Sequence, residues 1–522
     1  MNSFVQKHRS DVIGVLSGFD RLVLRGTVRP VSYAEGMTRF LSTQGILLKD
    51  FGAYAEATST QVKQASLAIA ERVGRPVQYL ESPKVRKDEL AREIAKRDAI
   101  DEGLICVLTA VEPMWGFSLQ GNREAKKLEL RMKQRKCLHL YHYLQHPVFG
   151  FMHVRVQTWF PFQVQIWLNG REWLARTLDR KGIAYQRREN CFPWIADVER
   201  AQRLMDEQLE VCWPAALDLL RAKAHPAHEQ VFASFPFEYY WSVYQSEWAT
   251  DVMFRDQRTL AALYQRLVHH GITRFQCRDV LRFLGKKLTA DGSPRGNFTG
   301  EVTSDLKHRP EGIRLKHYVA GNSVKIYDKR GTVLRAETTI NEPHDFKVYR
   351  TAEGDDAGQP TWRGMRKGVA DMTRRTEVSQ AVNDRYLDAL ASCEDTAPLG
   401  ELTADVCRPV TWKGRRARAL HPWSPDDLEL LRAIGRAEFL VNGFRNADLS
   451  RVLHGTPPQD PAARRRQSSA VTRRIRLLRA HGLVHKRPKS HRYLVSPKGH
   501  RIISALLAAY QANTESLNKL AA

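Results

Sequence analysis

The end of this chain carries the pattern that most limits how it can fold. Segment 461–514 contains thirteen Lys and Arg residues and no Asp or Glu. Within it, Val471, Ile475 and Leu478 recur at helical spacing, so they are expected to form the buried stripe of a helix. The other faces of that helix are basic, and like charges at this density repel one another unless a polyanion lies close by. The pattern therefore predicts a packed helix with a basic outer surface.

The segments around this helix predict an ordered set of elements. Ser424-Pro425-Asp426-Asp427 is a typical helix start, with a serine cap, proline at the first position and acidic residues in the first turn. The order expected from there is helix, short helix, long helix, hairpin and final helix, over segments 426–444, 446–453, 462–481, 483–496 and 497–510. This order resembles the MarR-type winged helix, in which the long helix enters the major groove and the hairpin tip contacts the adjacent backbone.

The resemblance implies a DNA-binding domain over residues 424–522. Its contacts would come from the basic side chains of the long helix and the hairpin, which are Arg464, Arg465, Arg466, Arg473, Arg474, Arg476, Arg479, Lys486, Arg487, Lys489 and Arg492. Two alternatives remain open, a winged helix that binds another protein and one that binds RNA.

The composition of the whole chain favours the same class of partner. The sequence has 82 Lys and Arg residues against 57 Asp and Glu, a net charge of +25, so a phosphate backbone is the natural counterpart. The alternative is an enzyme that is simply basic. The seven cysteines include no Cys-x-x-Cys pair, and the sequence shows neither a signal peptide nor an apolar run long enough to span a membrane. We expect a cytoplasmic, nucleoid-associated protein with no membrane partner.

The fold class expected is α+β, in several domains. The predicted parts are a mixed α/β domain over 1–136, a hairpin with helices over 137–300, an antiparallel meander over 301–410, a basic linker over 411–423 and the winged helix over 424–522. The second and third parts can form one domain. The basic run 123–136 is interpreted as a solvated helix face, with nucleic-acid contact as the alternative.

The meander has chemically distinct faces. Its strands are expected at 312–319, 323–328 and 333–341. A period of two places one polar set on the same side, namely Arg314, Lys316, Lys325, Tyr327, Arg335 and Glu337. The turn between the last two strands would set Tyr327 opposite Arg335, and Lys325 opposite Glu337.

Within this set, Tyr327-Asp328-Lys329 followed by Arg335-x-Glu337 resembles the signature of rolling-circle replication initiators. The resemblance implies a metal-dependent DNA nickase or transesterase in which Tyr327 and Glu337 are catalytic. The basic members Arg314, Lys316, Lys325 and Arg335 would then bind nucleic acid. The alternative is a solvated sheet face with a Lys325–Glu337 cross-strand pair.

A metal site is the second chemical hypothesis. In the hairpin around residue 146, a symmetric loop would set His139 opposite His153, close enough to share Mg²⁺ or another divalent ion. The alternative is that both histidines are structural. Six carboxylates that suit Mg²⁺ are scattered along the chain with spacings that match no nuclease pattern, namely Asp20, Glu112, Glu247, Asp251, Glu301 and Asp305.

These observations lead to one functional expectation and two alternatives. The whole chain is similar to a group of bacterial proteins of comparable length, which implies a shared architecture and no particular activity. We expect a DNA-processing or nucleoprotein-assembly factor of a mobile element or replicon that binds nucleic acid, DNA rather than RNA, and can form a homodimer. The alternatives are a transcriptional regulator with a large sensory or oligomerising body, and a non-catalytic protein that binds structured RNA.

Overall fold

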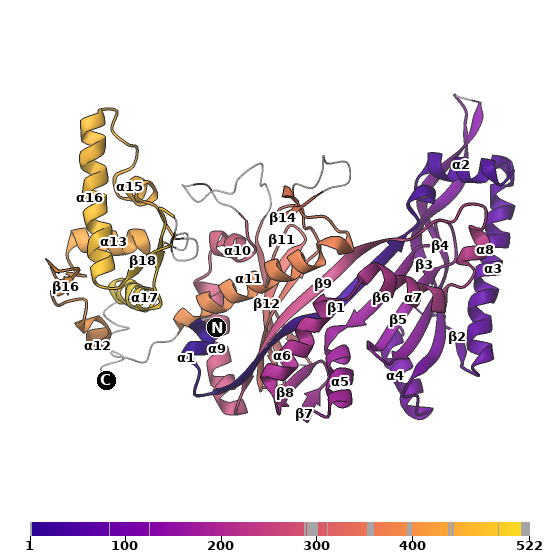
Figure 1. The fold of residues 1–522 in the computed structure, drawn as a ribbon, viewed down its shortest axis with the longest axis horizontal. Coiled ribbons are helices and arrows are strands. Elements are labelled where there is room, and N and C mark those ends of the chain that lie inside the picture. Colours follow the sequence, from indigo (N-terminus) through magenta and orange to yellow (C-terminus); the bar gives the residue numbers. More distant parts are fainter. Residues whose placement is uncertain are drawn as a thin grey trace. The chain divides into compact units, whose positions relative to one another are not determined.

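The computed structural model describes residues 3–82, 84–124, 126–286, 289, 301–310, 312–351, 360–393, 399–436, 439, 443–488 and 490–512. It divides into two compact units, which are described separately. Unit 1 comprises Met1–Val12, Arg255–Gly331 and Ala381–Ala522, and unit 2 comprises Ile13–Phe254 and Thr332–Gln380. Helices and strands are mixed in both units, so the expected α+β, multidomain fold class is confirmed (Figure 1).

Unit 2 is built on one mixed sheet. Its strands lie in the order β13-β9-β1-β6-β5-β4-β3-β2. β2 pairs with β3 in parallel, whereas β3–β4, β4–β5, β5–β6, β1–β6 and β9–β13 are antiparallel. The strands are β1 (Val12–Thr27), β2 (Val77–Tyr79), β3 (Gly103–Asn122), β4 (Lys127–His146), β5 (Gly150–Gln157), β6 (Val164–Asn169), β9 (Tyr240–Phe254) and β13 (Val333–Ile340).

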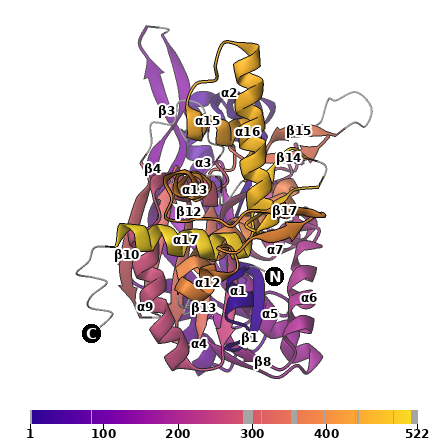
Figure 2. The same ribbon diagram turned by 90° about the vertical axis from the view of Figure 1, so that its left-hand side faces the viewer.

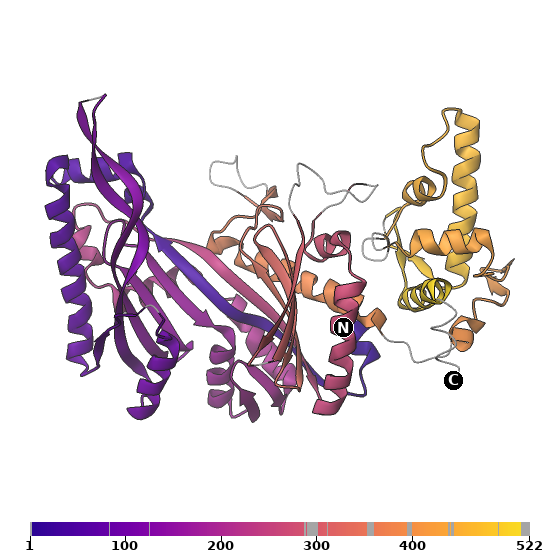
Figure 3. The same cartoon turned by 180° about the vertical axis from the view of Figure 1, so that it is seen from behind.

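Helices cover both faces of this sheet because its strands are apolar on both sides. In β4, Leu140 joins the core formed with α3 and α7, whereas the next residue, Tyr141, joins the core formed with α4. α5 and α6 pack over β1, β9 and β13, and Figure 3 shows α3 running along the strands. The helices of unit 2 are α2 (Ala34–Thr43), α3 (Phe51–Arg72), α4 (Lys87–Arg97), α5 (Gly170–Lys181), α6 (Val198–Asp206), α7 (Trp213–Ala224) and α8 (His228–Val231). Two small hairpins complete it, β7 (Tyr185–Arg188) with β8 (Cys191–Ile195), and β14 (Lys347–Arg350) with β15 (Thr361–Gly364).

The basic run 123–136 does not form the expected helix. From Lys127 onward it belongs to β4, which pairs with β3 along its length. The reason is visible in the sequence, because Leu128, Leu130 and Met132 alternate with charged residues at a period of two rather than 3.6.

Unit 1 contains two of the expected meander strands and the helices that cover them. β10 (Thr303–Arg309), β11 (Gly312–Val319) and β12 (Asn322–Lys329) form an antiparallel ladder. α9 (Gln257–Thr273) packs on it, and its Tyr264 hydroxyl donates to the carbonyl oxygens of Ile313 at 2.7 Å and Ile326 at 3.1 Å. The other helices are α1 (Ser3–Lys7), α10 (Cys277–Phe283) and the second part of α11 (Met372–Leu390), which begins in unit 2.

The C-terminal part of unit 1, residues 399–512, has its own core and is called the C-terminal body here. Val471, Ile475 and Leu478 are 0%, 2% and 0% exposed, so the predicted apolar stripe is buried. The predicted order of elements is also found. The elements are α12 (Leu399–Ala404), β16 (Val410–Trp412), β17 (Arg415–Ala417), α13 (Pro425–Ile434), α15 (Asn446–His454), α16 (Pro461–Ala480), β18 (Val484–Lys486), β19 (Tyr493–Val495) and α17 (Pro497–Gln511).

The expected linker 411–423 is wrong. β16 and β17 form a hairpin, and Leu420 is 1% exposed within the core of the C-terminal body. Arg418 donates two hydrogen bonds of 2.7 Å to the carboxylate of Asp427 on α13. A basic, proline-rich composition is typical of a linker, but Ala419 and Leu420 of this segment are buried. Among the described residues, no helix combines the length and apolar character that a membrane span requires.

Candidate metal and nucleic-acid sites

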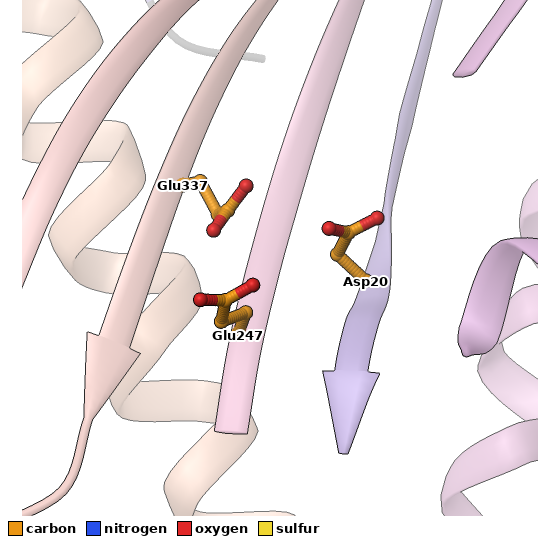
Figure 4. A group of neighbouring side chains, drawn as sticks. All are labelled: Asp20, Glu247 and Glu337. Atoms are coloured by element: carbon orange, nitrogen blue, oxygen red, sulfur yellow. The ribbon is translucent and has the colours of Figure 1, made fainter. Parts of the chain in front are cut away.

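Three buried carboxylates from distant parts of the chain meet in unit 2 (Figure 4). Asp20 on β1, Glu247 on β9 and Glu337 on β13 each offer one oxygen atom, and these atoms lie within 4.8 Å of one another. The three residues are 5%, 7% and 2% exposed. Carboxylate oxygens are the usual protein ligands of Mg²⁺ and Mn²⁺. We call Asp20, Glu247 and Glu337 the carboxylate triad.

Strand geometry explains how the triad assembles. β9 and β13 are antiparallel, with Ala249 opposite Glu337 and Thr339 opposite Glu247. Side chains two residues apart share a face of a strand, so Glu247 and Glu337 are diagonal neighbours on one face of the sheet. β1 follows β9 in the sheet and brings Asp20 beside them.

A buried guanidinium fixes the triad residue Asp20. Arg335 is fully buried, and its Nη1 donates to Asp20 Oδ1 at 2.9 Å. It also donates two hydrogen bonds to Asp251, from Nε to Oδ1 at 2.6 Å and from Nη2 to Oδ2 at 2.8 Å. Arg171 on α5 donates to the same Asp251 Oδ2 at 2.9 Å. Asn190 adds bonds of 3.0 and 3.1 Å from its Nδ2 to the Asp20 carboxylate.

These contacts keep the buried groups charged. Burial by itself would raise the pKa of Asp251, but Arg335 and Arg171 outweigh it and hold that pKa below its usual value. Burial would likewise lower the pKa of Arg335, and Asp251 and Asp20 outweigh it, so that pKa lies well above its usual value. Both groups are therefore ionised at neutral pH, and Arg335 orients the side chain of Asp20.

The Glu247 end of the triad is closer to solvent. Arg21 is 45% exposed, and its Nε lies 3.9 Å from Glu247 Oε2. Glu247 is the main reason why the pKa of Arg21 is raised, and Asp20 and Glu337 add to the shift. Gln245 donates from Nε2 to Glu247 Oε1 at 3.1 Å. Asp20 is thus held by several hydrogen bonds, whereas Glu247 lies next to the partly exposed Arg21.

The sequence named the triad residues without bringing them together. Glu337 came from a resemblance, and Asp20 and Glu247 stood among six scattered carboxylates. Of the other four, Asp251 lies beside the triad and shares Arg335 with Asp20. Glu112 binds Lys87 and Arg155, Asp305 binds Arg314 in unit 1, and Glu301 is exposed. The one available signal was an acidic residue inside an otherwise apolar strand, as Asp20 is in β1.

The meander residues are distributed over both units. In unit 1, Arg314 is opposite Tyr327 and Lys316 is opposite Lys325, so these four share a face as expected. Tyr327 is 8% exposed, with the Lys329 and Lys325 ammonium groups 4.7 and 5.5 Å from its ring centre. The interpretation as a solvated face is therefore wrong for Arg314, Lys325 and Tyr327, which are all buried.

Two further meander expectations have different outcomes. Arg335 was expected to bind nucleic acid, but it is fully buried and bound to two aspartates, so that expectation is wrong. The pairs Tyr327–Arg335 and Lys325–Glu337 each have one member in each unit and stay predictions.

The expected histidine metal site is not formed. The register of β4 and β5 sets His139 opposite Gln157 and His153 opposite Tyr143. Four residue pairs therefore separate the two histidines, or about 13 Å at 3.3 Å per residue. The pairing is symmetric about Val148, whereas a pair of His139 with His153 would need a turn centred on His146. Burial lowers the pKa of each histidine to about 4, and both serve as neutral side chains of the sheet.

The arginines of α16 fall into two groups. Arg464 donates to the carbonyl oxygen of Pro458, Arg474 has a buried Nη1, and Arg479 lies over the rings of Trp412 at 5.0 Å and Tyr493 at 5.8 Å. These three contribute to the fold of the C-terminal body. The exposed group consists of Arg465, Arg466, Arg473 and Arg476, of which Arg476 also lies 6.0 Å from the Trp412 ring centre.

The hairpin after α16 adds further basic side chains. Lys486 and Arg487 are exposed, and Lys486 is opposite Tyr493 in the β18–β19 ladder. Arg492 donates from Nη1 to the carbonyl oxygen of Gly443 at 3.2 Å. Lys489, the expected tip contact, lies outside the described residues.

Comparison with known proteins adds no relative to this geometry. No family model matches the chain, and no match is found among curated proteins or solved structures. The arrangement itself defines the class considered below, an α+β protein with a basic helical body and a buried carboxylate triad.

Proposed function

We propose that this chain binds duplex DNA through the C-terminal body, which acts as a MarR-type winged helix with α16 as its recognition helix. The observation that carries the proposal is the exposed face of α16. Arg473 follows the buried Val471 by two residues, which at about 100° per residue directs it away from the core. Viewed along the helix axis, Arg466 points about 20° and Arg476 about 60° away from the direction of Arg473.

The physical argument is electrostatic and geometric. An α-helix fits the major groove, where an arginine can bind the O6 and N7 acceptors of guanine with two hydrogen bonds. The segment 461–514 holds no acidic residue that would repel phosphates. The exposed residues Lys486 and Arg487 of the hairpin would contact the backbone beside the groove.

Binding of the full chain to fluorescent DNA at several salt concentrations tests this proposal. Changing Arg473→Gln together with Arg476→Gln should weaken binding by about 1–3 kcal/mol for each arginine that binds a base edge, and should relax the sequence preference. The matched control is Arg200→Gln with Arg203→Gln, two exposed arginines of α6. If both double variants behave alike, α16 is not the DNA-binding helix. Tighter binding to RNA than to DNA would favour the RNA-binding alternative.

A second function, cleavage of phosphodiester bonds, is supported by the carboxylate triad. A divalent ion held there would polarise a phosphate oxygen or stabilise the leaving oxygen. The chain supplies the orientation, because Arg335 and Asn190 hold Asp20 in place while β9 and β13 fix Glu247 and Glu337. The partly exposed Arg21 next to Glu247 can attract a phosphate group.

Nicking of supercoiled DNA in Mg²⁺ or Mn²⁺ tests this second function. Glu337→Gln and Glu247→Gln should each abolish nicking and also remove the rise in melting temperature that Mn²⁺ gives the wild type. Glu199→Gln, an exposed acid of α6, is the control for charge. Tyr327→Phe shows whether the tyrosine forms a covalent adduct with DNA. Nicking by Glu337→Gln at the wild-type rate would exclude the triad as the site.

A further inference from the structure

The β3–β4 hairpin continues well beyond the sheet to which it belongs. β2 pairs with β3 only at residues 77–79, and β5 pairs with β4 only from His139 onward. Twelve residue pairs, from Val111 with Leu138 to Asn122 with Lys127, therefore form a two-stranded ribbon. At 3.3 Å per residue this ribbon is about 40 Å long. Its tip projects beyond α2 (Figures 1 and 2).

The two faces of this ribbon differ in chemistry. On one face, Phe117 and Leu130 are 0% and 4% exposed and pack in the core that includes α2. Because the period is two, the alternate residues form the other face. Towards the tip, β3 contributes hydrogen-bonding side chains to this face and β4 contributes charged ones, in the pairs Ser118–Arg131, Gln120–Glu129 and Asn122–Lys127. Nearer the sheet, Met114 on the same face is 6% exposed and packs in the core.

The polar face carries an excess of positive charge. Glu129 is surrounded by donors, with Asn122 Nδ2 at 2.8 Å, Arg131 Nη2 at 3.3 Å and Lys127 Nζ at 3.6 Å. On this face β4 carries Lys127, Arg131, Lys133 and Arg135 against the single acid Glu129, so one glutamate cannot balance the face. Arg135 is an exception, because it stacks on Trp159 at 4.1 Å and donates to the carbonyl oxygen of Phe117.

We propose that the polar face of the β3–β4 ribbon enters the major groove of duplex DNA, as a contact separate from α16. Two-stranded ribbons fit that groove, which is about 12 Å wide. Glutamine and asparagine can bind adenine with two hydrogen bonds and arginine can bind guanine, so this face carries the side chains that read base edges. An open hollow at the tip is lined by Gln120, Gly121, Asn122, Arg123, Glu124 and Arg131.

The shape of the ribbon argues for DNA over RNA. The major groove of A-form RNA is too narrow for side chains to read, whereas that of B-form DNA admits the whole ribbon. An isolated hairpin of this kind is marginally stable in water, and α2 covers only its apolar face. Contact with a polyanion would balance the charge that the polar face presents. This inference rests on the proposed DNA-binding function.

The test uses the full chain and a triple variant, Lys127→Gln, Arg131→Gln and Lys133→Gln. Because each of the three side chains should contribute about 0.9 through its own phosphate, the salt slope of duplex DNA binding should decrease by about 2.7. The matched control removes three exposed charges from unit 2 outside the ribbon, with Lys181→Gln, Arg200→Gln and Arg203→Gln. Circular dichroism checks that both variants fold. Gln120→Ala tests base reading, and it should change the preferred sequence while the salt slope stays the same.

The outcomes separate the ribbon from the recognition helix. If the triple variant has the same salt slope as the control while the α16 double variant weakens binding, the ribbon inference is overturned. The DNA-binding function then remains supported. If neither variant weakens binding, both proposals fail. An equal decrease in affinity for duplex RNA and duplex DNA would overturn the assignment to the DNA major groove.

Discussion

Arg335 makes three buried hydrogen bonds to carboxylates in unit 2. Its guanidinium bonds to Asp20 and Asp251 with distances of 2.6 to 2.9 Å, and none of these three residues is more than 5% exposed. A buried charge pair adds little net stability over apolar residues, but removing one member leaves the other unpaired in the interior. The main effect of removing Arg335 would therefore be to leave the buried carboxylates of Asp20 and Asp251 without this cation.

Arg335→Met should lower the free energy of unfolding by about 3–5 kcal/mol, because Asp251 and Asp20 would be left without their main cation. Urea denaturation of the full chain measures this decrease. Arg86→Met removes the exposed Arg86–Glu89 pair and should leave the stability almost unchanged, because solvent screens that pair. Equal effects of the two changes would contradict the central role of Arg335.

Sequence reasoning reached the right residues here and assigned one of them wrongly. The period of two in β13 correctly placed Arg335 and Glu337 on one face. It could not show that β9 and β1 place Asp251 and Asp20 beside that face. Pairing between strands that are distant in the sequence produces no periodic pattern from which the partners can be identified. In a basic chain, an arginine on a polar strand face suggests a nucleic-acid contact, but the partners of Arg335 are carboxylates of its own fold.

At the scale of elements, local periodicity was the most reliable guide. The stripe of α16 and the order of elements in the C-terminal body followed from the sequence. The strands in segments 123–136 and 411–423 were not predicted, because a high density of charge is typical of a solvated helix or a linker. In both, a few apolar residues set the structure, such as Leu130 in β4 and Trp412 in β16.

The β16–β17 hairpin should stabilise the C-terminal body through Trp412. Its ring lies 5.0 Å from the Arg479 guanidinium and 6.0 Å from that of Arg476. Trp412→Ala removes two cation–π contacts and should cost about 1–2 kcal/mol, at about 0.5–1 kcal/mol each. Trp412→Phe keeps a ring and should cost less. Thermal unfolding followed by near-ultraviolet circular dichroism measures both, and equal destabilisation by the two changes would argue against the stacking.

At the scale of the whole molecule, several buried histidines make unit 2 sensitive to acid. Burial lowers the pKa of His139, His142 and His153 from 6.5 to about 4. Between pH 6.5 and about 4, these histidines bind protons in the unfolded chain but stay neutral in the folded chain. The free energy of unfolding therefore falls as the pH decreases. Above pH 6.5 the histidines are neutral in both states and this dependence disappears.

His142 provides the measurement. It is 1% exposed, with its Nε2 2.7 Å from Ser66 Oγ. The free energy of unfolding, measured by urea denaturation, should fall less between pH 7 and pH 5 in His142→Gln than in the wild type. The difference is up to about 1.4 kcal/mol for each pH unit between the two pKa values. His454→Gln, at an exposed position of α15, should keep the wild-type dependence. A His142→Gln variant with that same dependence would contradict the assignment.

The bond between Arg335 and Asp20 joins residues that are 315 positions apart. On a ribosome that adds roughly 5–20 residues per second, β1 would emerge roughly 15–60 s before β13 can complete the sheet around it. During that interval, β1 presents an apolar strand with open edges, which favours pairing with other chains. The carboxylate triad thus exists only once more than half of the protein has been synthesised, so an incompletely translated chain cannot contain the site.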